Sequence, residues 1–259
     1  MKPWAALVAL AVFARLAVAA DGAGEHVPPA PPQTRVHAMP YDEMAAMMGM
    51  DDRARFGKVM LNRFEWMDAD ESTLAWDAAA WYGGDFHKIW IEAEGERTAR
   101  HSSTRLEMLW DRIATRWWST RLGLRQDSGI GPARSWAAVG VAGTMPGFVE
   151  LEASAYLGES GRTALRMKAD LDLLLTQRLI LQPEAELDVY GQGDAERLIG
   201  AGLSEFELGL RLRYEIRREL APYIGLSWRK RFGDSATLAR AAGEAADDLV
   251  WLAGVRAWF

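Results

Sequence analysis

The segment from Phe206 to Ile216 alternates strictly between two kinds of residue, and this alternation is the strongest constraint on the fold. It reads Phe-Glu-Leu-Gly-Leu-Arg-Leu-Arg-Tyr-Glu-Ile, so every even position is apolar or aromatic and every odd position is charged or Gly. Successive side chains of a β-strand point to opposite faces, so this strand would have one apolar and one ionic face. The alternation recurs about a dozen times and the chain ends on Val-Arg-Ala-Trp-Phe, which is typical of a closed barrel in a bacterial outer membrane.

The pattern predicts an all-β fold, a closed up-and-down antiparallel transmembrane barrel over residues 56–259. About twelve strands are expected, an even number as in bacterial single-chain barrels. The first strand is irregular, because Val59 and Leu61 share their parity with Arg63 and Glu65. The expected strands are 56–68, 73–82, 86–96, 104–110, 114–125, 134–143, 147–157, 162–174, 178–190, 202–217, 222–232 and 247–259.

The connections between these strands mostly alternate in length. Short connections lie at 83–85, 144–146 and 175–177, and longer ones at 98–103, 126–133, 191–201 and 233–246. Outer-membrane barrels have short periplasmic turns and longer external loops, so the pattern predicts that both ends of the barrel chain face the periplasm. One tight turn, at 158–161, falls on the external side and is an exception.

The ionic faces of the strands would line the barrel lumen. Unpaired charges in a narrow lumen are costly, whereas opposite charges on neighbouring strands neutralise one another. Two interpretations remain open: an internal salt-bridge lattice that stiffens the wall, and a selective path for ions. The expected lumenal charges are Glu150, Glu152, Glu184, Glu186, Glu205, Glu207, Glu215, Arg166, Lys168, Arg211, Arg213, Arg229 and Arg256.

Composition excludes several classes of protein. After the N-terminus there is no run of about 18 uncharged apolar residues, so any membrane span must consist of strands. Cys is absent, which excludes disulfides, Cys-based zinc sites and thiol nucleophiles. The 12 Trp residues suit either the aromatic girdles of a membrane barrel or a buried core. Without Lys2 and Arg15 of the leader, the 30 basic residues fall to 28 against 36 acidic ones, and no basic patch for nucleic acid is found.

Residues 1–20 have the features of a cleaved signal peptide. Lys2 gives a positive start, Trp4 to Ala14 is apolar, and Ala-Val-Ala-Ala at 17–20 offers small residues for cleavage. We therefore expect export from the cytoplasm. Residues 21–55 would follow as a flexible periplasmic segment, beginning with a tether that carries Pro-Pro-Ala-Pro-Pro at 28–32.

The second part of that segment, from His37 to Met50, is the strongest candidate for chemistry. Thioethers are soft ligands that suit Cu(I), and imidazole also binds Cu(II), so a mixture of the two favours copper over zinc or calcium. Alternatively, Met44, Met47 and Met48 form one face of an amphipathic helix that serves only as a structural plug. The candidate metal ligands are His37, Met39, Met44, Met47, Met48 and Met50.

No nucleophile, base and orienting acid can be assigned from spacing, so the chain is not predicted to be an enzyme. His87 and His101 are isolated in the sequence and are interpreted as ordinary polar residues. A barrel enzyme whose site is assembled across strands remains an alternative, as does a passive pore, with the Met segment acting as a plug in either case.

Several stretches resemble the copper resistance protein B family, outer-membrane proteins of Gram-negative bacteria. They run in order from about residue 55 to the end of the chain and include Trp-Tyr-Gly-Gly-Asp at 81–85, Ile-Glu-Ala-Glu-Gly-Glu at 91–96, Gly-Glu-Ser-Gly-Arg-Thr-Ala at 158–164 and Ala-Pro-Tyr-Ile-Gly at 221–225. Further matching stretches are 64–66, 173–183 and 209–219.

The resemblance implies a copper-binding barrel that helps the cell tolerate excess copper, beside periplasmic copper oxidases and carriers. It also implies that the barrel-assembly machinery reads the terminal Phe259. Many members carry long Met- and His-rich repeats before the barrel, whereas this chain has only the short segment at 37–50. That difference favours a few sites at the barrel mouth, export, or partner docking over high-capacity storage. Glu65, Glu92 and Glu94 are weaker lumenal candidates for copper ligands.

Overall fold

The computed structural model describes residues 40–49, 54–68, 72–99 and 101–259. Contacts divide the chain into two units, Met1–Asp52 and Arg53–Phe259. The predicted signal peptide, the Pro-rich tether and the candidate ligands His37, Met39 and Met50 lie outside the described residues.

The described part of the first unit is the helix α2 (Tyr41–Met48). Ala, Met and Glu favour helix, and the amide of Met44 donates to the Pro40 carbonyl at 3.1 Å in the first turn. Gly49 follows at φ +64°, a left-handed conformation that commonly ends a helix. Met44, Met47 and Met48 are all exposed.

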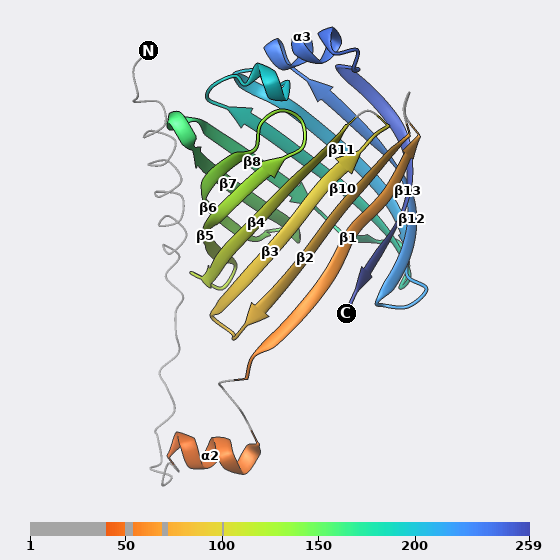
Figure 1. The fold of residues 1–259 in the computed structure, drawn as a ribbon. Coiled ribbons are helices and arrows are strands. Elements are labelled where there is room, and N and C mark those ends of the chain that lie inside the picture. The colour runs from red at the N-terminus through yellow and green to blue at the C-terminus, as the bar shows by residue number, and fades with distance from the viewer. Residues whose placement is uncertain (1–39, 50–53, 69–71, 100) are drawn as a thin grey trace. The chain divides into compact units, whose positions relative to one another are not determined.

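The second unit is one closed antiparallel sheet (Figure 1). Consecutive strands pair, except that β8 and β9 both pair with β10. β13 pairs with β1 to close the ring, where the amide of Phe259 donates to the Val59 carbonyl at 2.8 Å. The strands are β1 (Phe56–Asp68), β2 (Thr73–Gly83), β3 (His87–Arg97), β4 (Ser102–Ile113), β5 (Trp118–Ser128), β6 (Arg134–Met145), β7 (Val149–Gly158), β8 (Thr163–Asp170), β9 (Leu173–Leu174), β10 (Leu179–Tyr190), β11 (Gly202–Tyr214), β12 (Leu220–Arg231) and β13 (Asp247–Trp258).

The predicted twelve-strand barrel is confirmed, because β8 and β9 both pair with β10 and form two pieces of one wall strand. The expected continuous strand 162–174 is divided at Leu171 and Asp172, although the register with β10 is unchanged and the Leu171 amide donates to the Pro183 carbonyl at 3.2 Å. The expected loop 233–246 contains a helix, α3 (Gly233–Ala241). Two 3-10 turns, η1 (Glu159–Gly161) and η2 (Ala195–Arg197), complete the fold.

One predicted turn is misplaced. The sequence pattern put the fourth connection at 111–113, whereas β4 continues to Ile113 and the chain turns at residues 114–117. The hydroxyl of Thr115 accepts hydrogen bonds from the amides of Trp117 at 3.4 Å and Trp118 at 3.2 Å. Thr and Ser hydroxyls stabilise turns in this way, a signal that alternation of polarity does not contain.

The irregular first strand contains a β-bulge. Leu61 pairs with Ala78 and Arg63 pairs with Asp77, so Asn62 is an extra residue in β1. Asn62 and Arg63 both line the lumen, and both side chains contact Asp77. The bulge reverses the parity of the strand, which explains how Val59 is exposed outside while Glu65 is buried inside.

The outer wall is apolar and the inner wall is ionic, as the alternation predicts. Exposed outer side chains include Ile91, Leu122, Leu124, Ile224 and Leu249. Trp residues are found both on the outer wall and in the buried interior. Trp66, Trp110 and Trp251 are exposed, whereas Trp136 is buried. Among the residues described, no helix is long and apolar enough to cross a membrane.

The two rims of the barrel differ. The short-turn rim holds the start of β1, the end of β13 and the turns at 84–86, 114–117, 146–148, 175–178 and 215–219. The long-loop rim holds the other connections, including those with η2 and α3 (Figure 1). This confirms the predicted alternation of short and long connections.

Candidate functional site

The lumen contains two cavities lined by charged side chains. The larger, of about 740 Å³, lies toward the short-turn rim and is lined by residues from the start of β3 and the ends of β4, β6 and β13. The smaller, of about 240 Å³, lies toward the long-loop rim. Arg63, Glu94 and Arg105 line both cavities, so these side chains mark the boundary between them.

A buried cluster on β1, β10, β11 and β12 forms one side of this boundary. Arg211 donates through Nε to Glu65 Oε1 at 2.5 Å and through Nη1 to Glu184 Oε2 at 3.2 Å. Glu184 also accepts from Arg63 at 3.2 Å, and the Tyr223 hydroxyl donates to Glu65 at 2.9 Å. Glu65 is 2% exposed and Arg211 is 3% exposed, so each buried charge has an opposite charge beside it.

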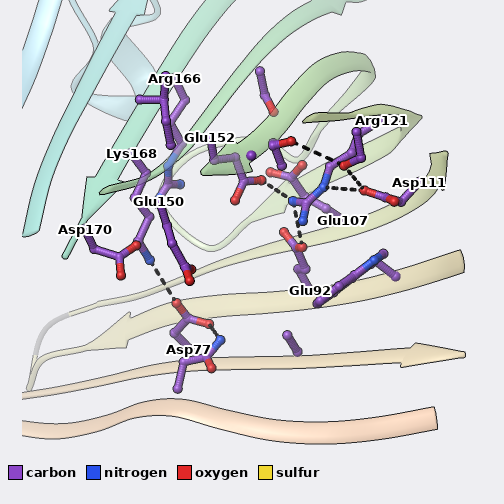
Figure 2. A pocket seen from close by; sticks show the side chains of 18 of the residues that line it. Asp77, Glu92, Glu107, Asp111, Arg121, Glu150, Glu152, Arg166, Lys168 and Asp170 are labelled. Carbon is purple, nitrogen blue, oxygen red and sulfur yellow. Dashed lines mark hydrogen bonds and ion pairs between the residues drawn. The ribbon is translucent and has the colours of Figure 1, made fainter. Parts of the chain in front are cut away.

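Further ion pairs run across the lumen between strands that are not neighbours. Lys168 on β8 reaches Asp77 on β2, with Nζ 3.5 Å from Oδ2 (Figure 2). Arg166, also on β8, contacts Glu94 on β3 at 2.7 Å across the lumen, and it also contacts Glu186 on the neighbouring strand β10 at 2.6 Å. These pairs fill the middle of the barrel with side chains.

Arg121 on β5 organises the wall of the larger cavity. It contacts Asp111 at 3.3 Å and Glu92 at 3.2 Å, and its Nη1 also donates to Glu152 (Figure 2). The guanidinium lies over the ring of Trp90, with its carbon 5.1 Å from the ring centroid. Three carboxylates therefore share one cation at this point.

A second negative feature of the larger cavity is a pair of facing carboxylates. Glu150 on β7 is in register with Asp170 on β8, and neither forms an ion pair with another described residue. Asp170 accepts a hydrogen bond from the Gln182 amide at 3.3 Å, whereas Glu150 has no hydrogen-bond partner among the described residues. Both are among the side chains lining the cavity in Figure 2.

The smaller cavity is bordered by ion pairs that reach the loops. Arg229 on β12 donates to Glu96 on β3 and to Glu207 on β11. Arg231 contacts Glu244, which follows α3, at 2.5 Å. The other oxygen of Glu244 lies 3.2 Å from Nε2 of His101, so the isolated histidine of the sequence joins two loops.

The lattice interpretation of the lumenal charges is the arrangement that the structure shows. Neighbouring strands neutralise one another as expected, for example Arg121 with Asp111 and Arg229 with Glu207. Further pairs, which the alternation did not predict, span the lumen. Burying ions is costly, so each such pair is tolerated only with its partner in place. Of the expected lumenal charges, Glu215 lies beyond the end of β11 and outside the lattice.

The structure places the sequence-derived metal candidates in two groups. Glu65, Glu92 and Glu94 all face the lumen, and all three are engaged by Arg side chains. Met44 and Met47, with Met48, lie exposed on α2, and their soft thioethers fit Cu(I). In the described residues, no group of three or more His, Asp or Glu side chains is placed to hold a metal ion.

Sequence reasoning missed several residues that shape the lumen. Tyr156 donates to Glu107 at 3.0 Å, and Tyr223 donates to Glu65. Trp90 and Asp77 line the larger cavity. Strand parity could have assigned Tyr156 and Trp90 to the lumen, but their contacts depend on strands far apart in the chain.

Comparison with known proteins adds the biological context. The family described as Copper resistance protein B precursor (CopB) matches residues 55–259. The chain belongs to the copper resistance protein B family. It is 43% identical to Copper resistance protein B of Escherichia coli over 78% of this chain and 69% of that relative. It is 36% identical to the Copper resistance protein B homolog of Pseudomonas syringae pv. tomato over the full chain and 92% of that relative.

Solved structures support the fold of this family member. The NanC porin superposes with a TM-score of 0.52 at 12% identity, covering 77% of this chain and 98% of the porin. The KdgM porin gives a TM-score of 0.50 at 12% identity, covering 78% of this chain and 99% of the porin. The barrel fold is thus shared with porins, whereas the sequence belongs to the copper resistance family.

Proposed function

We propose that this protein is a copper-binding barrel of a Gram-negative outer membrane and not an enzyme. It would contribute to copper resistance by capturing periplasmic copper on the segment His37 to Met50 and sequestering or exporting it at the barrel. Family membership supports the role in copper resistance. The apolar outer wall supports the membrane location. The short-turn rim would face the periplasm, as in barrels of this class.

The observation that carries the copper proposal is the set of three exposed thioethers on α2. Met44, Met47 and Met48 are all exposed on α2, so no described residue of their own unit covers the three thioethers. Thioethers at this spacing are soft donors, which favours Cu(I) over harder cations.

The charge lattice favours sequestration over an open conduit. Lys168 with Asp77 and Arg166 with Glu94 place side chains across the lumen, so the passive-pore alternative would require these contacts to separate. The unneutralised pair of Glu150 and Asp170 would attract cations to the larger cavity.

The partners proposed are outer-membrane lipid, the barrel-assembly machinery and a periplasmic copper oxidase or copper carrier. The terminal Phe259 is exposed at the end of the wall, where the assembly machinery could reach it. No nucleic acid is expected, because the chain carries a net negative charge.

The chain offers a matched pair of variants for the copper test. One variant changes the five N-terminal Met residues to Leu, which keeps their apolar volume and removes sulfur. The control changes the five barrel Met residues to Leu. The first set is Met39, Met44, Met47, Met48 and Met50, and the second is Met60, Met67, Met108, Met145 and Met167.

We expect the first variant to lose Cu(I) stoichiometry, measured by competition with a chromogenic chelator, and to lose copper tolerance in a deletion strain. The control should retain both. Unchanged copper binding in the first variant, with the barrel correctly assembled, would refute the N-terminal site. Loss of Cu(I) binding in the control variant alone would indicate that the copper site lies in the barrel.

A further inference from the structure

The connection between β10 and β11, residues 191–201, folds inward at the long-loop rim. Two of its residues, Arg197 and Ile199, line the smaller cavity. Ile199 also packs against the apolar cluster inside the lumen that includes Trp136 and Tyr190. Loops normally run over the surface of a protein, so an external connection that packs a side chain inside the barrel lies across its end.

The middle of this connection is one compact unit. The Asp194 amide donates to the Ile199 carbonyl at 2.8 Å, and the Ile199 amide donates to the Asp194 carbonyl at 3.0 Å, so the residues on either side of η2 are bonded to each other. Leu198 adopts φ +61°, a left-handed conformation that is costly for a bulky residue, and it directly precedes the side chain that enters the lumen. A strained backbone persists only where surrounding contacts hold it, so the unit must be held in place by its neighbours.

Polar contacts tie this unit to the neighbouring connections. The Asp194 carboxylate lies 2.8 Å from Nε of Arg134, at the start of β6, and 3.8 Å from Nη2 of Arg162, which follows η1. Arg197 donates through Nη1 to the Pro132 carbonyl at 2.9 Å. Water can satisfy each of these polar groups if the unit moves outward, so the contacts hold the inward position without making it permanent.

Both arms of the connection are rich in Gly. Gly191 and Gly193 precede the unit, and Gly200 and Gly202 follow it. The Gly200 amide donates to the hydroxyl of Ser235 on α3 at 2.7 Å, and a Cβ at Gly200 would lie 2.4 Å from the Ser235 amide nitrogen. Gly202 adopts φ +90°. Hinges are short segments, often of small residues, that absorb backbone rotation, so these arms suit a unit that swings.

We propose that residues 191–201 are a lid over the long-loop end of the lumen, with Ile199 as its plug and Asp194 as its tether. With the lid closed, the contents of the lumen exchange at the short-turn rim, toward which the larger cavity lies. Passage to the other side requires the lid to swing outward. The inference rests on the proposed function and deepens it, because it makes sequestration the closed state of the barrel and export the open state.

The absence of Cys allows the lid to be tested with two matched reporters. Ala75→Cys places a thiol in the smaller cavity, and Ala142→Cys places one in the larger cavity. Each reporter would be measured in the full-length protein folded in detergent, where both ends of the barrel meet solvent. The readout is the rate at which a water-soluble methanethiosulfonate reagent modifies each thiol, followed by mass spectrometry.

Two variants release the lid. Asp194→Asn removes the charge that holds Arg134 and Arg162, and Ile199→Ala shortens the plug. The control is Asp68→Asn, the same change at an exposed residue at the end of β1 that forms no ion pair with a described residue. The gel shift between folded and heated protein establishes that every variant forms the barrel.

We expect both lid variants to raise the modification rate of the reporter at 75 several-fold, and Asp68→Asn to leave that rate unchanged. The reporter at 142 should keep its rate in all variants. An unchanged rate at 75 in both lid variants would overturn the lid. Equal increases at 75 and 142 would also overturn it, because they would show a general loosening of the barrel. Neither readout uses copper, so these results are independent of the test of the N-terminal copper site.

Discussion

Removing Arg211 should destabilise the barrel more than removing any single exposed charge. Arg211 donates to Glu65 at 2.5 Å and 3.3 Å, and Glu65 is 2% exposed. In Arg211→Met the Glu65 carboxylate would keep only the hydroxyl of Tyr223, 2.9 Å away. Breaking a buried ion pair by removing one partner costs about 3–5 kcal/mol of unfolding free energy.

The companion variants separate the cost of the lone charge from the value of the pair. Tyr223→Phe removes one hydrogen bond to a charged group and should cost about 1.5–3 kcal/mol. Replacing both ions, in Glu65→Leu with Arg211→Met, should recover most of the loss, because well-packed apolar pairs are often as stable as buried ion pairs. Glu184 keeps Arg63 and Lys168 in every variant. Arg112→Met is the control, at an exposed residue that pairs with no carboxylate in the described part of the chain, and it is expected within about 0.5 kcal/mol of the wild type.

The assay is urea unfolding of the barrel in lipid vesicles, followed by tryptophan fluorescence and by the gel shift between folded and heated protein. The expected order of stability is wild type, then the double variant, then Arg211→Met. An Arg211→Met barrel that loses less than about 1 kcal/mol would contradict the reasoning, since the uncompensated carboxylate should carry the whole penalty. The single variant Glu65→Leu completes the cycle, and strict additivity of Glu65→Leu and Arg211→Met in the double variant would refute coupling between the two residues.

Two further predictions follow from the lumen and the wall. Lys168→Ser removes the bridge to Asp77 across the lumen, so its conductance in planar bilayers should exceed that of the wild type; a wild-type barrel that already conducts as an open pore would contradict a closed lattice. Gly95→Ala should lower the unfolding free energy by about 1–3 kcal/mol. Its Cβ would lie 2.3 Å from Cζ2 of Trp76 and 2.5 Å from the Ser103 carbonyl oxygen, and unchanged stability in the same urea assay would refute this.

The strands were predictable from the sequence because each one carries its own alternation of apolar and polar residues. In β11, Glu207, Arg211 and Arg213 face the lumen while Leu208 and Leu210 face outward, as their parity alone predicts. The rule fails where the local backbone departs from a regular strand.

The failures have identifiable causes. The extra residue Asn62 reverses the parity of β1, and the Thr115 hydroxyl moves the turn after β4 by hydrogen bonds that no polarity pattern contains. The segment expected as one strand at 162–174 loses its regular ladder at Leu171 and Asp172, because Pro183 on β10 accepts a bond from the Leu171 amide but has no amide hydrogen to donate in return. Alternation reports which face a side chain occupies and does not report where backbone pairing ends.

The candidate site, like the fold, was only partly predictable from the sequence. The soft donors Met44, Met47 and Met48 were identified by residue type and spacing, because a thioether keeps its chemistry in any fold. The position of Glu65 was different. Nothing near Glu65 in the sequence indicated that Arg211 and Tyr223 would donate hydrogen bonds to its carboxylate.

The sequence by itself determined that the chain forms about a dozen amphipathic strands with ions on one face, because side-chain alternation is a local property with a period of two. Only the tertiary structure decided which ions meet. Closure of the ring brings Lys168 on β8 opposite Asp77 on β2, and Arg166 opposite Glu94. Contacts across a lumen depend on strand tilt and register around the whole barrel, which no single strand encodes.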